Sequence, residues 1–242
     1  GNRSHHYFGS LSESEAYRTV EILVQENTPG FTTELWTQSP EIFSVGFVSP
    51  GGETIARIPP GLNNTTEVRF VLERTIIEVH YETILTTSGS QLIFMRFSAP
   101  TPGLWQIRVY GPPILDGDFH MCLPVYGFTE PEVIFLDPDP YTTITSPAVS
   151  SGVIAAGAYN AYNGSLYLHS SRGNNRLGMV KPDLCAPGVE VSGFGRLDAP
   201  AAFTGTSVSA AVTAGGAALI IEWGLSQDPA LLFSTTDIKN IL

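Results

Sequence analysis

Short runs that alternate apolar and polar residues fill the chain from about residue 16 to residue 126, and they constrain the fold more than any other feature. These runs recur with turn signals between them, which is the pattern of half-buried strands joined by tight connections. The clearest runs are residues 18–24, 31–36, 42–48, 68–72, 76–81, 91–97 and 104–110. Roughly seven to nine short strands at this spacing predict an antiparallel β-sandwich.

The chain has a different pattern near its C-terminal end. Gly205, Thr206 and Ser207 stand directly ahead of residues 209–221, which are small and apolar. Because this run is apolar nearly all round, it predicts a buried helix. Glycine weakens a helix by about 1 kcal/mol relative to alanine, so the pair at 215–216 predicts close packing against a neighbouring element.

Ser207 is a candidate nucleophile because of its place at the start of this helix. A serine hydroxyl needs a general base to take its proton, and the attacked carbonyl oxygen needs hydrogen-bond donors. The first turn of a helix supplies unpaired N–H groups and a partial positive charge. Gly205 and Thr206 are candidate substrate-binding residues, since a glycine lets a substrate backbone approach closely. Alternatively, Thr206 or Ser207 is only a helix cap.

Further segments upstream complete a recognisable order. Residues 153–158 read as a short, fully apolar strand, residues 170–173 are Ser-Ser-Arg-Gly, and residues 186–188 are Ala-Pro-Gly. With Gly-Thr-Ser at 205–207, this ordered set resembles the subtilisin-like serine peptidases (subtilases). The resemblance implies an α/β parallel-sheet domain and a peptidase, a hydrolase that cleaves peptide bonds through an acyl-enzyme on Ser207.

The chain departs from many subtilases directly after the nucleophile motif. Ala211 and Val212 stand where those enzymes have Pro-His. Variants without Pro-His occur among the clostridial germination-type subtilases, which also carry a jelly-roll insertion. The resemblance therefore implies a partial subtilase domain at 1–14 and 127–242, interrupted by an inserted β-sandwich or jelly roll at 15–126.

The role of the inserted sandwich stays open between structural support and binding of a carbohydrate or a partner. Trp36, Trp105 and Tyr110 are the aromatic residues that would stack on a sugar ring. Packing in the core explains the same residues equally well.

The other two members of a subtilase triad have no match in the sequence. The family order is Asp, His, Ser, with the histidine followed by Gly-Thr and the aspartate by Thr-Gly or Ser-Gly. No histidine here is followed by glycine, and neither aspartate motif occurs. We therefore expect both partners to precede residue 1, so that the chain is a C-terminal portion that is inactive alone. The alternative is a non-catalytic pseudoprotease that serves as a scaffold.

Gly1-Asn2 resembles the family segment whose asparagine amide donates into the oxyanion hole. Asn2 is either that donor or a neighbour of it, and a surface turn is the alternative. His5 and His6 lack Cys or carboxylate partners nearby in the sequence, so solvated or packed histidines are favoured over a metal site. No metal and no cofactor is predicted.

The composition bounds the partners and the location. With 12 Lys and Arg against 23 Asp and Glu, the formal charge of -11 argues against a nucleic-acid partner. The longest apolar run is short and glycine-rich for a membrane span, and Cys122 and Cys185 make no disulfide framework. The expected partner is a peptide or protein substrate, with the oligomeric state open. A secreted, cell-envelope or spore-associated location is favoured over a free cytoplasmic one.

Overall fold

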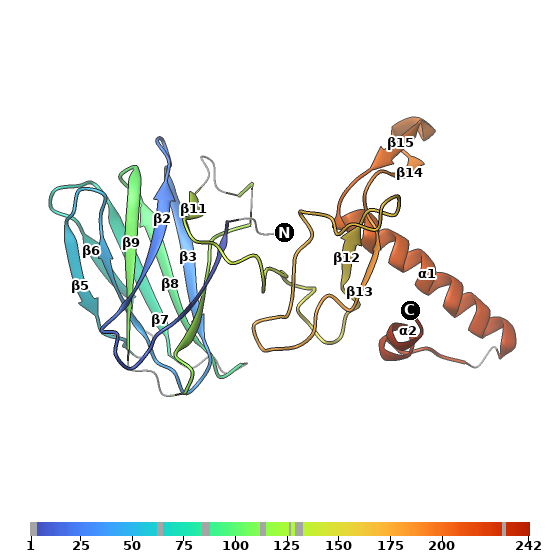
Figure 1. Ribbon diagram of the computed structural model, residues 1–242, viewed down its shortest axis with the longest axis horizontal. Helices are drawn as coiled ribbons and strands as arrows, with labels where there is room; N and C mark the ends of the chain where they lie inside the picture. The colour runs from blue at the N-terminus through green and yellow to red at the C-terminus, as the bar shows by residue number, and fades with distance from the viewer. Residues whose placement is uncertain are drawn as a thin grey trace. The chain divides into compact units, whose positions relative to one another are not determined.

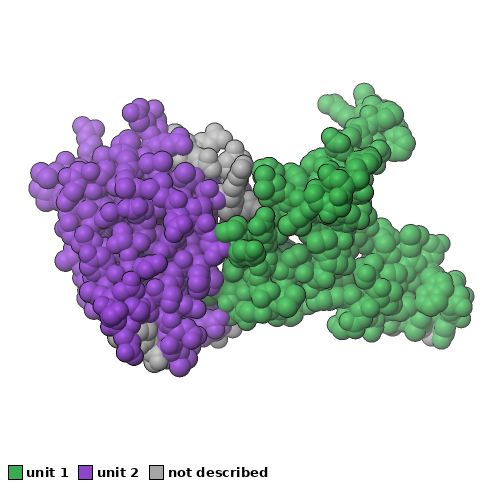
Figure 2. Space-filling model, in the orientation of Figure 1, with its two compact units in different colours: residues 1, 140–242 green, residues 2–139 purple. Residues whose placement is uncertain are grey.

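The computed structural model describes residues 4–61, 65–83, 88–111, 115–125, 127–128, 133–228 and 231–242. The chain forms two compact units, which are described separately below (Figure 2). One unit comprises residues 2–139, and the other comprises residues 140–242 together with residue 1.

The unit at 2–139 is a two-sheet antiparallel β-sandwich (Figure 1). One sheet has six strands in the order β1 (His6–Ser10), β10 (Asp118–Cys122), β3 (Gly30–Thr37), β8 (Gln91–Ser98), β7 (Ile76–Glu82) and β6 (Thr65–Arg69). The other has five strands in the order β11 (Val133–Phe135), β2 (Arg18–Val24), β9 (Gly103–Tyr110), β4 (Ser44–Val48) and β5 (Thr54–Ile58). Each strand pairs with its neighbours in antiparallel register.

The alternation in the sequence decides which side of each strand is buried. In β2, Val20, Ile22 and Val24 are at most 1% exposed, whereas the residues between them are half-buried. Successive strand residues point to opposite faces, so a period of two places one set in the core. Aromatic side chains fill the space between the sheets, and the ring of Trp105 meets that of Phe97 edge-on at 5.5 Å. The predicted antiparallel β-sandwich is confirmed.

The sandwich is wider than the predicted range of 15–126. β1 pairs with β10, and β11 pairs with β2, so strands on both sides of that range belong to its two sheets. Strands β1, β5, β10 and β11 were not predicted from the sequence. These strands have three to five residues, which is too short for a period of two to be distinctive.

The unit at 140–242 contains the segments that resemble a subtilase. Its elements are β12 (Ala156–Tyr159), β13 (Leu184–Pro187), β14 (Val191–Phe194), a 3₁₀ turn at Arg196–Asp198, β15 (Pro200–Phe203), α1 (Thr206–Gln227) and α2 (Thr235–Ile241). β12 and β13 are parallel, and β14 and β15 form an antiparallel pair. Among the described residues, this parallel pair is the part of the predicted α/β sheet that is present, and antiparallel strands dominate the chain.

Helix α1 is less buried than its sequence predicts. Only Ser209 and Gly224 are buried along its 22 described residues, so the expectation of a buried helix is wrong for this chain. Close packing does not account for Gly215 either, because a Cβ there would have nothing within 4 Å. Close packing occurs at Gly224 instead, against the ring of Phe233. Contrary to the expectation from its apolar run, α1 is by length and composition sufficient to cross a membrane, although core helices of soluble proteins pass the same test.

Candidate active site

A small parallel sheet supports the segment that contains Ser207. Ala156 to Tyr159 of β12 lie in register with Leu184 to Pro187 of β13, and α1 packs against both strands (Figure 1). Ala158 is fully buried and Ala186 nearly so. Small side chains on both strands let the helix approach the sheet closely.

Two glycines connect this sheet to the start of the helix. Gly188, directly after β13, donates its N–H to the carbonyl oxygen of Tyr159 at 3.0 Å. The carbonyl oxygen of Gly188 accepts the N–H of Gly205 at 2.8 Å. Gly205 is the N-cap of α1 and has a φ of 150°, a backbone conformation that residues other than glycine rarely adopt. The glycine of the Gly-Thr-Ser motif is therefore required by backbone geometry.

Ser209 attaches the first turn of α1 to the end of β13. Its side chain is fully buried, and its hydroxyl donates to the carbonyl oxygens of Ala186 at 3.1 Å and Pro187 at 3.3 Å. A Cβ on Gly188 would collide with this hydroxyl and would lie 2.7 Å from the Cβ of Ala158. This role of Ser209 was not predicted from the sequence, although a small polar residue in an apolar helix was a usable signal.

Ser207 faces away from this attachment. Residues two apart on a helix are separated by about 200° around its axis, so the burial of Ser209 places Ser207 on the opposite side. Ser207 is exposed, and within the described ranges its hydroxyl has no hydrogen-bond partner. The N–H groups of Val208 and Ser209 already bond to the carbonyl oxygen of Gly205. Those of Thr206 and Ser207 have no acceptor in the part of the chain that the structure describes, so they are available to an anionic group.

A short hairpin leads into the same helix start. β14 and β15 pair from Val191 with Phe203 to Phe194 with Pro200. The hydroxyl of Thr204 then accepts the N–H of Glu190 at 2.9 Å, which fixes the chain directly ahead of Gly205.

A buried ion-pair network holds the other side of the sheet. The Lys181 ammonium is fully buried and donates to Asp183 at 2.7 Å and to the carbonyl oxygen of Val153 at 2.8 Å. Asp183 also accepts the N–H of Ala155 at 2.7 Å and pairs with Lys239 of α2. Burial favours the neutral carboxyl, but the N–H of Ala155 and the two ammonium groups outweigh it and lower the pKa of Asp183. This network anchors α2 to the strands that carry the site.

The other predicted residues are distributed over both units. Asn2 lies outside the described residues. Trp105 is fully buried, and Trp36 is half-buried with its indole N–H on Glu34 at 2.8 Å. His5 and His6 are buried in the sandwich rather than solvated, with His6 3.0 Å from His120.

No group of three or more potential metal ligands occurs among the residues described here. Cys122 and Cys185 do not form a disulfide with each other.

Comparison with known proteins shows what the C-terminal part of the chain is similar to. Residues 137–242 match the model of the subtilase family. The matched range includes β12, β13 and the whole of α1. The predicted resemblance to the subtilases is thus confirmed for the part of the chain that carries Ser207.

Among the solved structures that match, one is similar over nearly the whole chain. It is the CspB protease of Clostridium perfringens, with a TM-score of 0.86 and 27% sequence identity across 99% of this chain. The match covers 50% of the CspB chain, so this chain spans about half the length of that protein. No curated protein matches the sequence.

Proposed function

We propose that this chain provides the nucleophile of a subtilisin-type serine endopeptidase. The observation that carries the proposal is the position of Ser207, which is exposed at the second position of α1 and has no hydrogen-bond partner among the residues that the structure describes. The attachment of Ser209 and the glycine contacts of Gly188 and Gly205 hold that position. The family match of the surrounding segment supports the same reading.

In the proposed reaction, the Ser207 hydroxyl attacks a peptide carbonyl carbon and forms a tetrahedral intermediate. The free N–H of Ser207 donates to the oxyanion, and the amide of Asn2 is the proposed second donor. Collapse of the intermediate releases the amine product, and water then hydrolyses the acyl-enzyme. Gly205 and Thr206 line the approach of the substrate backbone.

The proposal assigns the general base and its orienting carboxylate to residues other than 1–242, on a larger parallel sheet that β12 and β13 extend. In this chain no histidine stands in the expected motif, and in its described part none is hydrogen-bonded to Ser207. Residues 1–242 alone are therefore expected to be nearly inert.

Labelling with a fluorophosphonate probe tests the assignment in the whole protein that contains this chain. Ser207→Ala should abolish labelling, since loss of the serine costs about 10⁶-fold in kcat in subtilisin. Ser226→Ala is the matched control, because Ser226 is an exposed serine of the same helix and should label normally. Labelling that persists in Ser207→Ala would refute the nucleophile, and an unlabelled wild-type protein would favour the pseudoprotease.

A further inference from the structure

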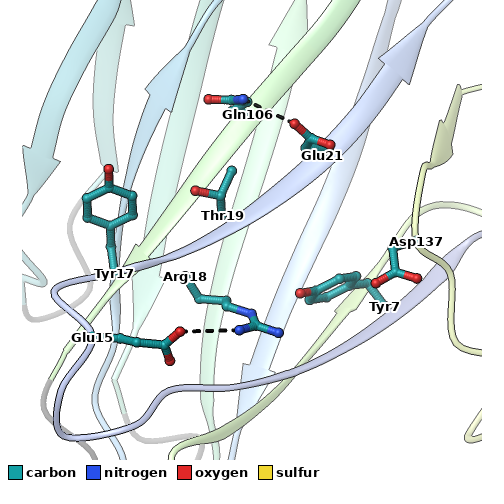
Figure 3. A pocket seen from close by; sticks show the side chains of 8 residues that line it. All are labelled: Tyr7, Glu15, Tyr17, Arg18, Thr19, Glu21, Gln106 and Asp137. Carbon is teal, nitrogen blue, oxygen red and sulfur yellow. Dashed lines mark hydrogen bonds and ion pairs between the residues drawn. The ribbon is translucent and has the colours of Figure 1, made fainter.

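A pocket of about 530 Å³ opens on the β-sandwich, in the unit that does not contain Ser207. Its volume falls within the range of about 300–1,000 Å³ that is usual for small-molecule sites. The residues that line it come from β2 and the segment before it, from the neighbouring strand β9, from β1 and from the turn after β11 (Figure 3).

The polar side chains in this pocket are placed by the sheet. Thr19 and Glu21 alternate with core residues of β2, so they stand on its outer face. Gln106 is the register partner of Glu21 on β9, and its amide donates to Glu21 at 3.1 Å. The N–H of Leu136 donates to the carbonyl oxygen of Glu21 at 3.1 Å, which brings Asp137 to the same pocket.

The ring of Tyr17, which lines the pocket, packs against other side chains of the sandwich. The guanidinium of Arg108 lies 4.9 Å from the ring centroid of Tyr17, and the ring of Tyr110 lies 5.3 Å from it. Arg57 in turn lies over Tyr110 at 5.9 Å. Tyr17 is 39% exposed, so it offers a fixed apolar surface whose ordering on binding costs little entropy.

Several polar groups here have hydrogen-bonding capacity left over. Within the described residues, the carboxylate of Asp137 and the hydroxyl of Thr19 have no protein partner. Glu21 and Gln106 use one atom each in their mutual bond, which leaves a carboxylate oxygen and an amide oxygen as acceptors. Arg18 is bonded to Glu15 at 3.3 Å and also interacts with the hydroxyl of Tyr7, and its five N–H donors exceed these two partners.

The charges narrow the class of ligand. Three carboxylates, those of Glu15, Glu21 and Asp137, line the pocket and disfavour an anion. The guanidinium of Arg18 lines the same pocket and can only donate hydrogen bonds, so it needs acceptor atoms that a simple cation lacks. A neutral ligand with many hydroxyl groups satisfies both conditions, because it donates to the carboxylates, accepts from the guanidinium and lays its C–H face on the tyrosine ring.

We propose that this pocket binds a neutral oligosaccharide. This binding does not depend on the proteolytic function. The stacking surface is Tyr17, in place of the aromatic residues that the sequence suggested for sugar stacking. Trp105 is in the core, and Tyr110 supports Tyr17 rather than lining the pocket. The site would let the protein attach to a glycan surface.

Saturation-transfer NMR and titration of residues 1–242 test this with cellotetraose, maltotetraose, triacetylchitotriose, its deacetylated cationic form, and sialyllactose. At least one of the three neutral probes should bind. Asp137→Ala and Tyr17→Ala should each weaken that binding by about tenfold or more, because a bond to a charged group or a stacking surface is lost. Tyr162→Ala, at an exposed tyrosine of the other unit, should leave it unchanged.

Three results would overturn the proposal. The first is that no neutral probe binds, and the second is that only the cationic or the anionic probe binds. The third is that a neutral probe binds the variants as tightly as it binds the wild type. If Tyr17→Ala fails to fold, Asp137→Ala decides alone, because its side chain is exposed and has no partner among the described residues whose loss would disturb the fold.

Discussion

Replacing Asp183 by asparagine removes the negative charge beside a lysine that has no access to solvent. The side chain of Lys181 is 0% exposed and that of Asp183 is 2% exposed. Removing one partner of a buried ion pair costs about 3–5 kcal/mol, because the other charge is left uncompensated. Lys181 keeps its bond to the carbonyl oxygen of Val153, and the asparagine oxygen can still accept the N–H of Ala155, as the carboxylate of Asp183 does. We therefore expect a loss of about 3 kcal/mol, at the lower end of that range.

Hydrogen exchange of the backbone amides of residues 155–159 measures this loss within the unit that contains it. A destabilisation of about 3 kcal/mol should speed their exchange about 100-fold. Asp198→Asn is the matched control, since Asp198 is exposed in the turn between β14 and β15, and surface changes usually stay within about 0.5 kcal/mol. Exchange at wild-type rates in Asp183→Asn would refute the argument that this ion pair fixes the strands.

The same site predicts a dependence on pH. The pKa of Asp183 in the folded chain lies below its ordinary value of 3.8. A lowered pKa means that the unfolded chain binds the proton more readily, so acid favours unfolding. The stability that Asp183 adds is complete above its ordinary pKa and is lost as the pH falls through the lowered one. The difference between wild type and Asp183→Asn should therefore shrink below about pH 4.

Two further substitutions test the packing in each unit. Gly188→Ala should destabilise the helix attachment by about 1–3 kcal/mol, because the new Cβ would lie 2.7 Å from that of Ala158. Gly152→Ala is the control, since its Cβ would lie 3.7 Å from the nearest described atom, the hydroxyl oxygen of Ser150. Equal midpoints of urea unfolding for the two variants would contradict this. Tyr81→Phe should cost the sandwich about 1–3 kcal/mol, since the buried hydroxyl donates to Ile58 at 2.8 Å and accepts from Val45 at 3.1 Å. Burial raises the pKa of Tyr81 to about 12. The wild type should therefore lose stability as the pH rises from 10 to 12, because the unfolded chain gives up this proton more readily. Tyr81→Phe should lack that loss, which spectrophotometric pH titrations of both proteins would measure.

Much of the sandwich follows from local sequence. The runs at 18–24, 76–81 and 91–97 lie within β2, β7 and β8, whose bounds differ from the predicted ones by at most one residue. A strand exposes its pattern directly, because the side-chain period of two is a property of consecutive residues. The order of strands in each sheet does not follow, because pairings such as β1 with β10 join residues more than a hundred positions apart.

The Gly-Thr-Ser motif and the small residues after it were sufficient to place Ser207 at the start of a helix. Helix starts and glycine requirements are local, and the φ of Gly205 agrees with both. Which serine is exposed and which is bonded to β13 depended on the tertiary structure, since the partners of Ser209 lie more than twenty residues upstream. The buried charge of Lys181 and the pocket around Tyr17 likewise arise from chain segments that only folding brings together, because charge burial and concavity are properties of packing rather than of consecutive residues.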